Sequence, residues 1–503
     1  MPAPLDRRAF LAALSCSAAA SLLGTPALAQ SGAAPGIAHD PLRPECHLLP
    51  PHNWMNDPNG PIWWKASYHL FYQLNPNAAV WGDMHWGHAI SSDMVHWRHL
   101  PIALAPTPGG DSAGCFSGSA VVFRGVPTFI YTGVENAPHD QATIRDGSNK
   151  LRETQMLATA EDDDLLHWKK LAAPVITAPP PGMQVTGFRD PCPWQEADGW
   201  YLGVGSGERG VGGCVLLYFS RDLREWQYLH KLAEGKPSGK QGANPVDTGE
   251  MWECPDFFQL DGRSCLFYST EGKVIWSTGD YDARAHRFTS KIDGVLDRGA
   301  YYAPKSFLTP DGRRILWGWI RETRPEAEYA AAGWAGVMSL PRQLNASQEG
   351  QIEIWPSLEV DRLRSGPEQR VTVDLNTPYQ LKLDALRHEF IATTGISAGS
   401  VTVRLLNNGA PIWELVVDVR GKTVRCGDIT FPLPPSPWPR PLLRLLLDAS
   451  VIESFIGGRE AFTSRVYKIQ PGQTYLEIAV KGASSVALSH WPLAAISANR
   501  LTT

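Results

Sequence analysis

The stretch "SSDMVHWRHL" at residues 91–100 decides the fold, because the chain uses the same pattern again. "EDDDLLHWKKL" at 161–171 and "SRDLREWQYL" at 220–229 repeat the order acidic residue, apolar residue, tryptophan, basic or polar residue, leucine. Trp97, Trp168 and Trp226 lie about 60 to 70 residues apart, and "GDYDARAHRF" is a weaker copy. A β repeat of this length fits a propeller blade of four strands with generous loops. Residues 40–355 then hold about five blades.

The remainder of the chain also favours strands. No convincing long amphipathic helix appears after residue 30, and short apolar runs are broken by Gly, Asn-Gly or Asp-Gly. Beyond a linker at 356–369, runs such as "SVTVRLLNNG", "WELVVDV" and "YLEIAV" predict a β-sandwich over 370–503. The sequence therefore predicts an all-β protein, a five-bladed β-propeller followed by a C-terminal β-sandwich. The sandwich is expected to buttress the propeller, with accessory sugar binding as the alternative.

The first residues resemble an export signal. "DRRAFLAALSCSAAASLLGTPALAQ" combines Arg7 and Arg8 with a short apolar run and a small-x-small cleavage site. The run is too short to span a bilayer. Residues 1–29 are therefore predicted to be a signal peptide of the twin-arginine type, with a plain secretory signal as the close alternative and a lipid anchor on Cys16 as a weaker one. We expect an exported protein, periplasmic or secreted, that is not held in a membrane.

Composition narrows the classes of ligand. The net charge of −5 and the lack of a long basic run argue against a nucleic-acid partner. The 19 Trp and 14 Tyr offer flat faces on which sugar rings stack, although tryptophans also pack β cores. Seven cysteines remain after the signal, without CxxC spacing, and "MHWGH" offers His85 and His88 without further ligands. Neither a metal site nor any other cofactor is expected.

The rarer motifs follow the rhythm of the blades. "NDPNG", "FSGS", "FRDP", "WECPD" and "RGAYYAP" carry Asp57, Ser117, Asp190, Glu253 and Tyr302. An Asp in a loop is often only a turn former. However, the innermost strands of a propeller line one central channel, so equivalent positions in different blades converge. Three carboxylates would then meet at the axis. Two carboxyls flanking a glycosidic bond can act as nucleophile and general acid/base, and a separation of about 5 Å implies retention of configuration.

Together with "HNWMNDPNG", "FYQLNP", "ILWGW", "GWAGVMSLPR" and the C-terminal "DASVIESF", these motifs resemble glycoside hydrolase family 32, the β-fructosidases. The resemblance covers essentially the whole mature chain. It implies a retaining glycosidase of the invertase, exo-inulinase or levanase kind. Such an enzyme releases terminal β-D-fructofuranosyl residues from sucrose or from fructans such as inulin and levan by double displacement.

The resemblance also implies residue roles. Asp57 would be the nucleophile, Glu253 the acid/base and Asp190 the transition-state stabiliser. The substrate-binding residues would be Asn56 and Gln73 as hydroxyl partners, Trp54 and Trp81 as apolar walls, Phe116 and Ser117 as pocket contacts, Arg189 beside Asp190, and Trp319 in "WGW". Loop amides should lower the pKa of Asp57, while an enclosed site should keep Glu253 protonated, which predicts a bell-shaped pH profile with an acidic optimum. Cys254 follows Glu253 and, on a regular strand, should face away from it.

Two other functions remain open. A fructosyltransferase shares the first half of the mechanism, although the intact "WMND" favours hydrolysis by resemblance. A non-catalytic sugar-binding protein on the same scaffold is the other alternative. It is disfavoured because all three carboxylates are present.

Overall fold

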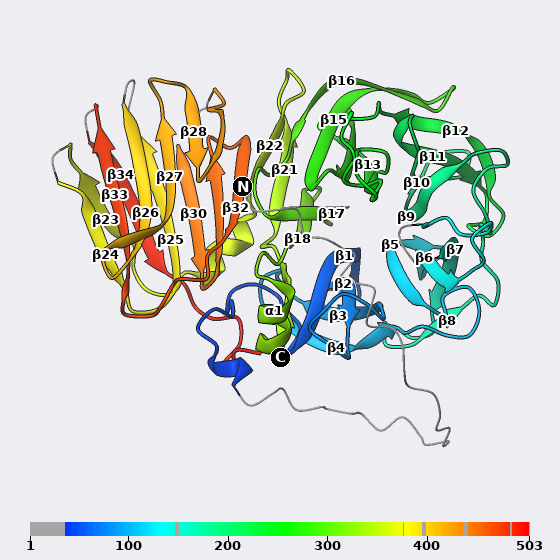
Figure 1. Ribbon diagram of the computed structural model, residues 1–503, viewed down its shortest axis with the longest axis horizontal. Helices are drawn as coiled ribbons and strands as arrows, with labels where there is room; N and C mark the ends of the chain where they lie inside the picture. Colours follow the sequence, from blue (N-terminus) through cyan, green and yellow to red (C-terminus); the bar gives the residue numbers. More distant parts are fainter. Residues whose placement is uncertain are drawn as a thin grey trace.

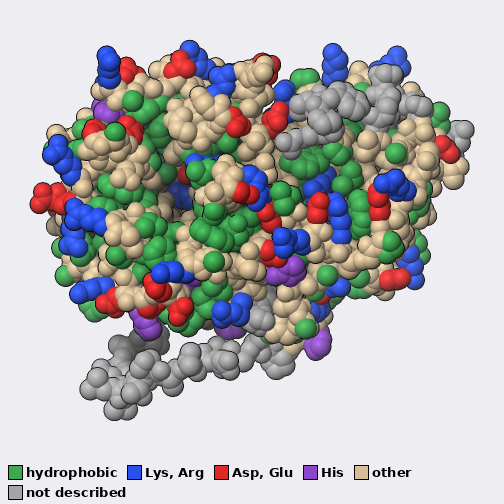
Figure 2. Space-filling view, turned by 180° about the vertical axis from the view of Figure 1, so that it is seen from behind, with side chains coloured by type: hydrophobic (Ala, Val, Ile, Leu, Met, Phe, Trp, Pro, Cys, Tyr) green, Lys and Arg blue, Asp and Glu red, His purple; other side chains and the backbone are tan. Residues whose placement is uncertain are grey.

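The computed structural model describes residues 36–501 except 146–149, 376, 395–398, 436–440 and 483–484, so the predicted signal peptide lies outside the described residues. Figure 1 shows two bodies side by side, a ring of blades and a β-sandwich. The predicted fold class is confirmed. Within the described part of the chain, none of the helices has the length and apolar character needed to cross a membrane. In Figure 2 Lys and Arg side chains are interspersed with Asp and Glu.

Five antiparallel sheets form the ring, each with its first strand innermost. Blade 1 comprises β1 (Asn53–Trp64), β2 (Ser67–Asn75), β3 (His85–Ser91) and β4 (Trp97–Leu104), and blade 2 comprises β5 (Gly114–Phe123), β6 (Val126–Asn136), β7 (Leu151–Ala160) and β8 (Trp168–Lys170). Blade 3 comprises β9 (Val185–Gln195), β10 (Trp200–Glu208), β11 (Gly212–Ser220) and β12 (Gln227–Glu234), and blade 4 comprises β13 (Glu253–Leu260), β14 (Arg263–Thr270), β15 (Lys273–Asp282) and β16 (Arg287–Val295). Blade 5 comprises β17 (Tyr301–Leu308), β18 (Arg314–Ile320), β20 (Val337–Met338), β21 (Arg342–Ala346) and β22 (Ile352–Pro356).

The ring is closed by segments from its two ends. The inner strands contact one another in sequence, and β17 of the last blade contacts β1 of the first. After β18 the chain forms the short helix α1 (Glu326–Ala332) and then β19 (Trp334–Ala335), which pairs in parallel with β1. The last blade therefore supplies a strand to the first blade's sheet, which joins the two ends of the ring.

The tryptophan repeat marks the turn that leads into the outermost strand of a blade. In blade 3, Asp222 accepts backbone N–H groups from Arg224 and Glu225, and Leu223 is buried in the left-handed conformation with φ 61°. Trp226 then donates its ring N–H to the carbonyl of Leu223 at 3.0 Å. The corresponding residues of blades 1 and 2 are Asp93, Met94 and Trp97, and Asp162, Leu165 and Trp168. An acidic cap, a buried apolar residue and a tryptophan thus fix the same turn three times.

Two six-stranded sheets pack face to face in the second body. The first contains β23 (Gln369–Val373), β34 (Val486–Pro492), β25 (Arg387–Thr394), β30 (Leu443–Asp448), β31 (Val451–Ile456) and β32 (Glu460–Arg465). The second contains β24 (Tyr379–Leu383), β33 (Thr474–Lys481), β26 (Ser400–Asn407), β27 (Ala410–Asp418), β28 (Thr423–Cys426) and β29 (Ile429–Pro432). Two 3-10 helices, η2 (Ile37–His39) and η3 (Leu358–Leu363), lie before the propeller and between the two bodies.

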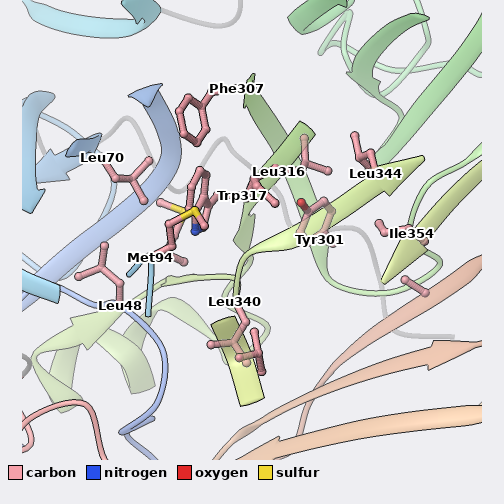
Figure 3. Close-up of a cluster of buried hydrophobic side chains, with 14 of the residues drawn as sticks. Leu48, Leu70, Met94, Tyr301, Phe307, Leu316, Trp317, Leu340, Leu344 and Ile354 are labelled. Carbon is pink, nitrogen blue, oxygen red and sulfur yellow. The ribbon is translucent and has the colours of Figure 1, made fainter. Parts of the chain in front are cut away.

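The two bodies share a buried core and a buried charge network. Figure 3 shows part of the core, including Trp317 and Tyr301. Beside it the ring nitrogens of His47 contact Asp448 at 2.7 Å and Glu453 at 3.0 Å, and Arg342 joins Glu453 to Asp297 of the propeller. All are at most 1% exposed. The network links propeller and sandwich, and removing one member would leave a buried charge without its partner.

Candidate active site

Each of the five inner strands carries a β-bulge near its start. In β1, Met55 pairs with Leu74 and Pro58 pairs with Tyr72. Two residues of β1 lie between these pairs, but only one residue of β2 does, so β1 carries one extra residue. The same extra residue occurs in the other inner strands, between Cys115 and Gly118, Arg189 and Cys192, Glu253 and Asp256, and Tyr302 and Lys305. A bulge redirects side chains and ends regular pairing. These five bulges bring the predicted residues together.

The bulges show which residues of the five motifs occupy equivalent positions in their blades. The residue directly before the Pro or Gly of each motif is Asp57, Ser117, Asp190, Cys254 or Ala303, and the residue before that is Asn56, Phe116, Arg189, Glu253 or Tyr302. Glu253 therefore corresponds to Arg189, whereas Asp190 corresponds to Cys254. In blades 3 to 5 the residue before the proline has a positive φ, which is 65° for Asp190. This conformation is uncommon for residues other than glycine and is typical of functional sites.

Asp57 accepts hydrogen bonds from the side chains of Ser117, Asn56 and Cys254. Ser117 donates its hydroxyl to Oδ2 at 2.7 Å, and Asn56 donates its amide to Oδ1 at 3.1 Å. Trp54 in turn donates its ring N–H to the amide oxygen of Asn56 at 2.8 Å, which orients that amide. Burial nevertheless raises the pKa of Asp57, because it outweighs the hydrogen bonds from Ser117 and Asn56. The amide of Asn56 does lower this pKa, as expected, but the prediction of a net lowering was wrong, because burial of the carboxylate outweighs the hydrogen bonds.

Asp190 is the most enclosed of the three carboxylates, at 3% exposure. Its Oδ2 accepts the backbone N–H of Cys254 at 2.8 Å, and its own N–H donates to the hydroxyl of Thr132 at 2.9 Å. Burial raises the pKa of Asp190 to about 7. The negative charges of Glu253 and Asp57 raise this pKa further, whereas the positive charge of Arg189 lowers it. The carboxylates are therefore electrostatically coupled, as groups that surround one substrate should be.

Glu253 is fixed from two neighbouring blades. Arg189 donates from Nη2 at 2.8 Å and from Nε at 3.2 Å to Oε1, and Tyr302 donates its hydroxyl to Oε2 at 2.8 Å. Burial and the negative charge of Glu253 raise the pKa of Tyr302 well above its ordinary value, so the phenol stays protonated as a donor. Arg189 thus contacts Glu253, in addition to its charge interaction with Asp190.

Cys254 does not face away from the site. Its thiol lies 3.4 Å from Oδ2 of Asp57 and 3.5 Å from Oδ2 of Asp190. The expectation of a strand residue turned outward was wrong, because the bulge and a φ of 48° break the alternation of side chains. Burial raises the pKa of the thiol well above its usual range. Cys254 therefore remains a neutral donor between two carboxylates.

Aromatic side chains form the walls. Trp54 and Trp319 meet edge to face with centroids 5.6 Å apart, and Trp81 meets Phe116 in the same way at 5.8 Å. The sequence did not single out Tyr329 of α1, which packs on Trp54 at 5.8 Å. All five belong to one cluster of apolar contacts. The closing segment of the ring thereby contributes to the wall of the site.

Gln73 of β2 links blade 1 to the inner strand of blade 2. It is 2% exposed and donates its amide to the carbonyl of Cys115 at 2.9 Å, directly before Phe116 and Ser117. A second supporting residue that the sequence did not reveal is Glu153 on β7, which forms an ion pair with Arg189 at 2.8 Å. Its local sequence "RETQ" carries no motif, so only the three-dimensional contact identifies it.

The arrangement suits acid/base and nucleophilic chemistry on a sugar. Asp57, Asp190 and Glu253 lie on the inner strands of blades 1, 3 and 4, and the negative charges of Glu253 and Asp57 act on Asp190. The donors to Asp57 stabilise its ionised form, and three carboxylates together stabilise positive charge that develops on a sugar ring. Among the described residues, no cluster of His, Cys, Asp or Glu could hold a metal ion, and the seven cysteines are buried free thiols.

Protein-family models and known relatives match most of the chain. Two protein-family models match the chain, the glycosyl hydrolases family 32 N-terminal domain over residues 47–356 and the family 32 C-terminal domain over 429–492. A sucrose-6-phosphate hydrolase of Escherichia coli is 37% identical over 469 residues, which span 86% of this chain and 91% of that relative.

Solved structures resemble the chain over most of its length. A β-fructofuranosidase of Bombyx mori superposes with a TM-score of 0.77 at 29% identity, covering 91% of this chain and 95% of the other. The fructan 1-exohydrolase IIa of Cichorium intybus superposes with a TM-score of 0.72 at 28% identity, covering 90% and 98%.

Proposed function

The chain belongs to glycoside hydrolase family 32, and on this premise we propose that Asp57, Asp190 and Glu253 carry out the release of terminal β-D-fructofuranosyl units. The enzyme is a glycosidase that releases fructosyl units. The observation that supports these residue roles is the pair of differently held carboxylates: Asp57 between Ser117 and Asn56, and Glu253 between an arginine and a tyrosine.

The first step forms a covalent intermediate. Asp57 attacks the anomeric carbon of the fructosyl unit, and the bond to the leaving oxygen breaks as Glu253 transfers its proton to that oxygen. Ser117 and Asn56 keep Asp57 oriented for this attack. Asp190 binds ring hydroxyls and stabilises the positive charge that develops on the ring.

The second step consumes water. Glu253, now ionised, takes a proton from a water molecule, whose oxygen attacks the anomeric carbon and displaces the carboxylate of Asp57. Two inversions give retention of configuration. Arg189 and Tyr302 hold the carboxylate of Glu253 in this ionised state.

We propose sucrose and fructans of the inulin and levan type as substrates. The names of the relatives support this class, since they include a sucrose-6-phosphate hydrolase, a β-fructofuranosidase and a fructan exohydrolase. We place Trp54, Trp81 and Trp319 against the apolar faces of the sugar, and Asn56, Gln73, Phe116, Ser117 and Arg189 around it. We also propose export of the protein, on the twin-arginine pattern at residues 1–29.

The test is a chromatographic time course of products from separate incubations with sucrose, sucrose 6-phosphate, inulin and levan. Free fructose from the earliest time points, without longer oligomers, would support exo-hydrolysis, and the relative rates would name the preferred substrate. Oligomers longer than the substrate at high sucrose would favour fructosyl transfer instead. Release of nothing from any of the four substrates would contradict the proposed roles of Asp57 and Glu253.

A further inference from the structure

Glu153 is a fully buried carboxylate outside the three that face the substrate. It lies on β7 of blade 2 at 0% exposure. Its Oε2 accepts the backbone N–H of Phe188 at 2.6 Å and the hydroxyl of Thr143 at 2.8 Å, and its Oε1 accepts Nη1 of Arg189 at 2.8 Å. Both oxygens therefore accept hydrogen bonds from named partners, as a buried polar group requires.

Arg189 is shared between two glutamates. Its Nη1 contacts Glu153, while its Nη2 and Nε contact Oε1 of Glu253. Glu153, Glu253 and Asp190 together raise the pKa of Arg189, against the effect of burial. Glu153, which does not face the sugar, thus partly neutralises the single positive charge of the Arg189 guanidinium.

This sharing bears on an acid/base group. Glu253 must be protonated to start the reaction, yet a guanidinium on its carboxylate favours the ionised form. Without Glu153 the whole charge of Arg189 would act on Glu253 and Asp190. With Glu153 in place, Arg189 can orient Glu253 while opposing its protonation less.

We propose that Glu153 is a positioning residue that orients Arg189 and weakens its charge toward Glu253, so that Glu253 keeps its catalytic proton to higher pH. This rests on the proposed role of Glu253 as the acid. Glu153 touches neither Glu253 nor the substrate space directly, and acts through Arg189.

The other groups around Glu253 are also charged or titratable. Asp57 on β1 and Asp190 on β9 oppose its ionisation, and the neutral thiol of Cys254 adjoins them. Tyr302 on β17 donates to it, with Arg321 stacked on the Tyr302 ring at 5.3 Å. The hydrogen-bond partners of Glu153 are Phe188, Thr143 and Arg189, so a change at Glu153 reaches Glu253 through Arg189.

The test is the pH dependence of kcat/KM on sucrose for Glu153→Gln. Glutamine keeps the size and an oxygen acceptor but removes the charge. The guanidinium of Arg189 lies between Glu153 and Glu253 and is hydrogen-bonded to both. At this separation, removing the negative charge of Glu153 should lower the pKa of Glu253. The alkaline limb of the profile should therefore move to lower pH by about one unit. Activity below that limb should change little, and activity above it should fall about tenfold.

Two further measurements separate positioning from general support of the fold. Glu153→Asp keeps the negative charge but moves it away from Arg189 by the length of one methylene. Its alkaline limb should therefore move in the same direction as that of Glu153→Gln, but by a smaller amount. If the glutamine variant does not fold, this variant still tests the proposal. On an aryl β-fructofuranoside, whose leaving group needs little protonation, the loss above the limb should largely disappear.

An unmoved alkaline limb, with kcat/KM lowered equally at all pH values and for both substrates, would overturn the proposal and leave Glu153 a structural residue only. Wild-type enzyme without activity on any fructoside would instead mean failure of the proposed function itself. The two failures are therefore distinguishable.

Discussion

Ser117→Ala should move the acidic limb of the pH profile upward. The Ser117 hydroxyl donates to Oδ2 of Asp57 at 2.7 Å, and Ser117 is only 4% exposed, so water replaces the lost donor poorly. A hydrogen bond to a charged group is worth about 1.5 to 3 kcal/mol, which corresponds to about one to two units in the pKa of Asp57. Because burial already raises this pKa, the ionised nucleophile depends on Ser117 and Asn56.

The sign follows from the role of Asp57 as a nucleophile. Only the carboxylate attacks, so activity is lost as pH falls through the pKa of Asp57, and a higher pKa starts that loss at a higher pH. We expect the acidic limb of kcat/KM for sucrose to rise by about one unit, with about tenfold less activity below it and little change near neutrality.

Ser119→Ala is the matched control for Ser117→Ala. Ser119 lies two residues further along β5 and is also buried, but its hydroxyl donates to the carbonyl of Pro191 at 2.8 Å and does not contact Asp57. Its acidic limb should stay where the wild-type limb is. If Ser117→Ala lowers kcat/KM by one factor at every pH, or if both variants move the limb alike, the reasoning is refuted.

Much of the fold could be predicted because its signals are local. Asp222, Leu223 and Trp226 make a complete turn within five residues, and the chain uses that turn three times, so spacing alone indicates the blades. The alternating apolar runs of the sandwich are equally local. By contrast, the strand β19 that joins blade 5 to blade 1 has only two residues and is defined by its pairing with β1.

The candidate site was found in part for the same reason. Asp57 and Asp190 stand directly before a proline in their motifs, and those positions are where the inner strands bulge. The orientation of Cys254 could not be predicted, since the alternation rule assumes a regular strand. The raised pKa of Asp57 depends on burial by other blades, and Glu153 is identified only by its contact with Arg189.

Two further predictions concern catalysis and stability. Glu253→Gln removes the acid/base group and should lower kcat on sucrose by about 10²- to 10⁴-fold, measured as fructose release; wild-type kcat in this variant would exclude Glu253 as the acid. The second concerns His47, whose pKa is raised to about 9 by hydrogen bonds to Asp448 and Glu453, against the effect of burial. A raised pKa stabilises the fold fully below the unfolded value of about 6.5, and this stability is lost as pH rises through 9. The free energy of unfolding in urea should therefore fall by up to about 3 kcal/mol between these pH values. His47→Gln leaves the buried carboxylate of Asp448 without its cation and Glu453 with Arg342 alone, so the variant should be less stable by about 3 to 5 kcal/mol at pH 6 and should lose the slope above it. A slope that persists in the variant would assign the pH dependence to other groups.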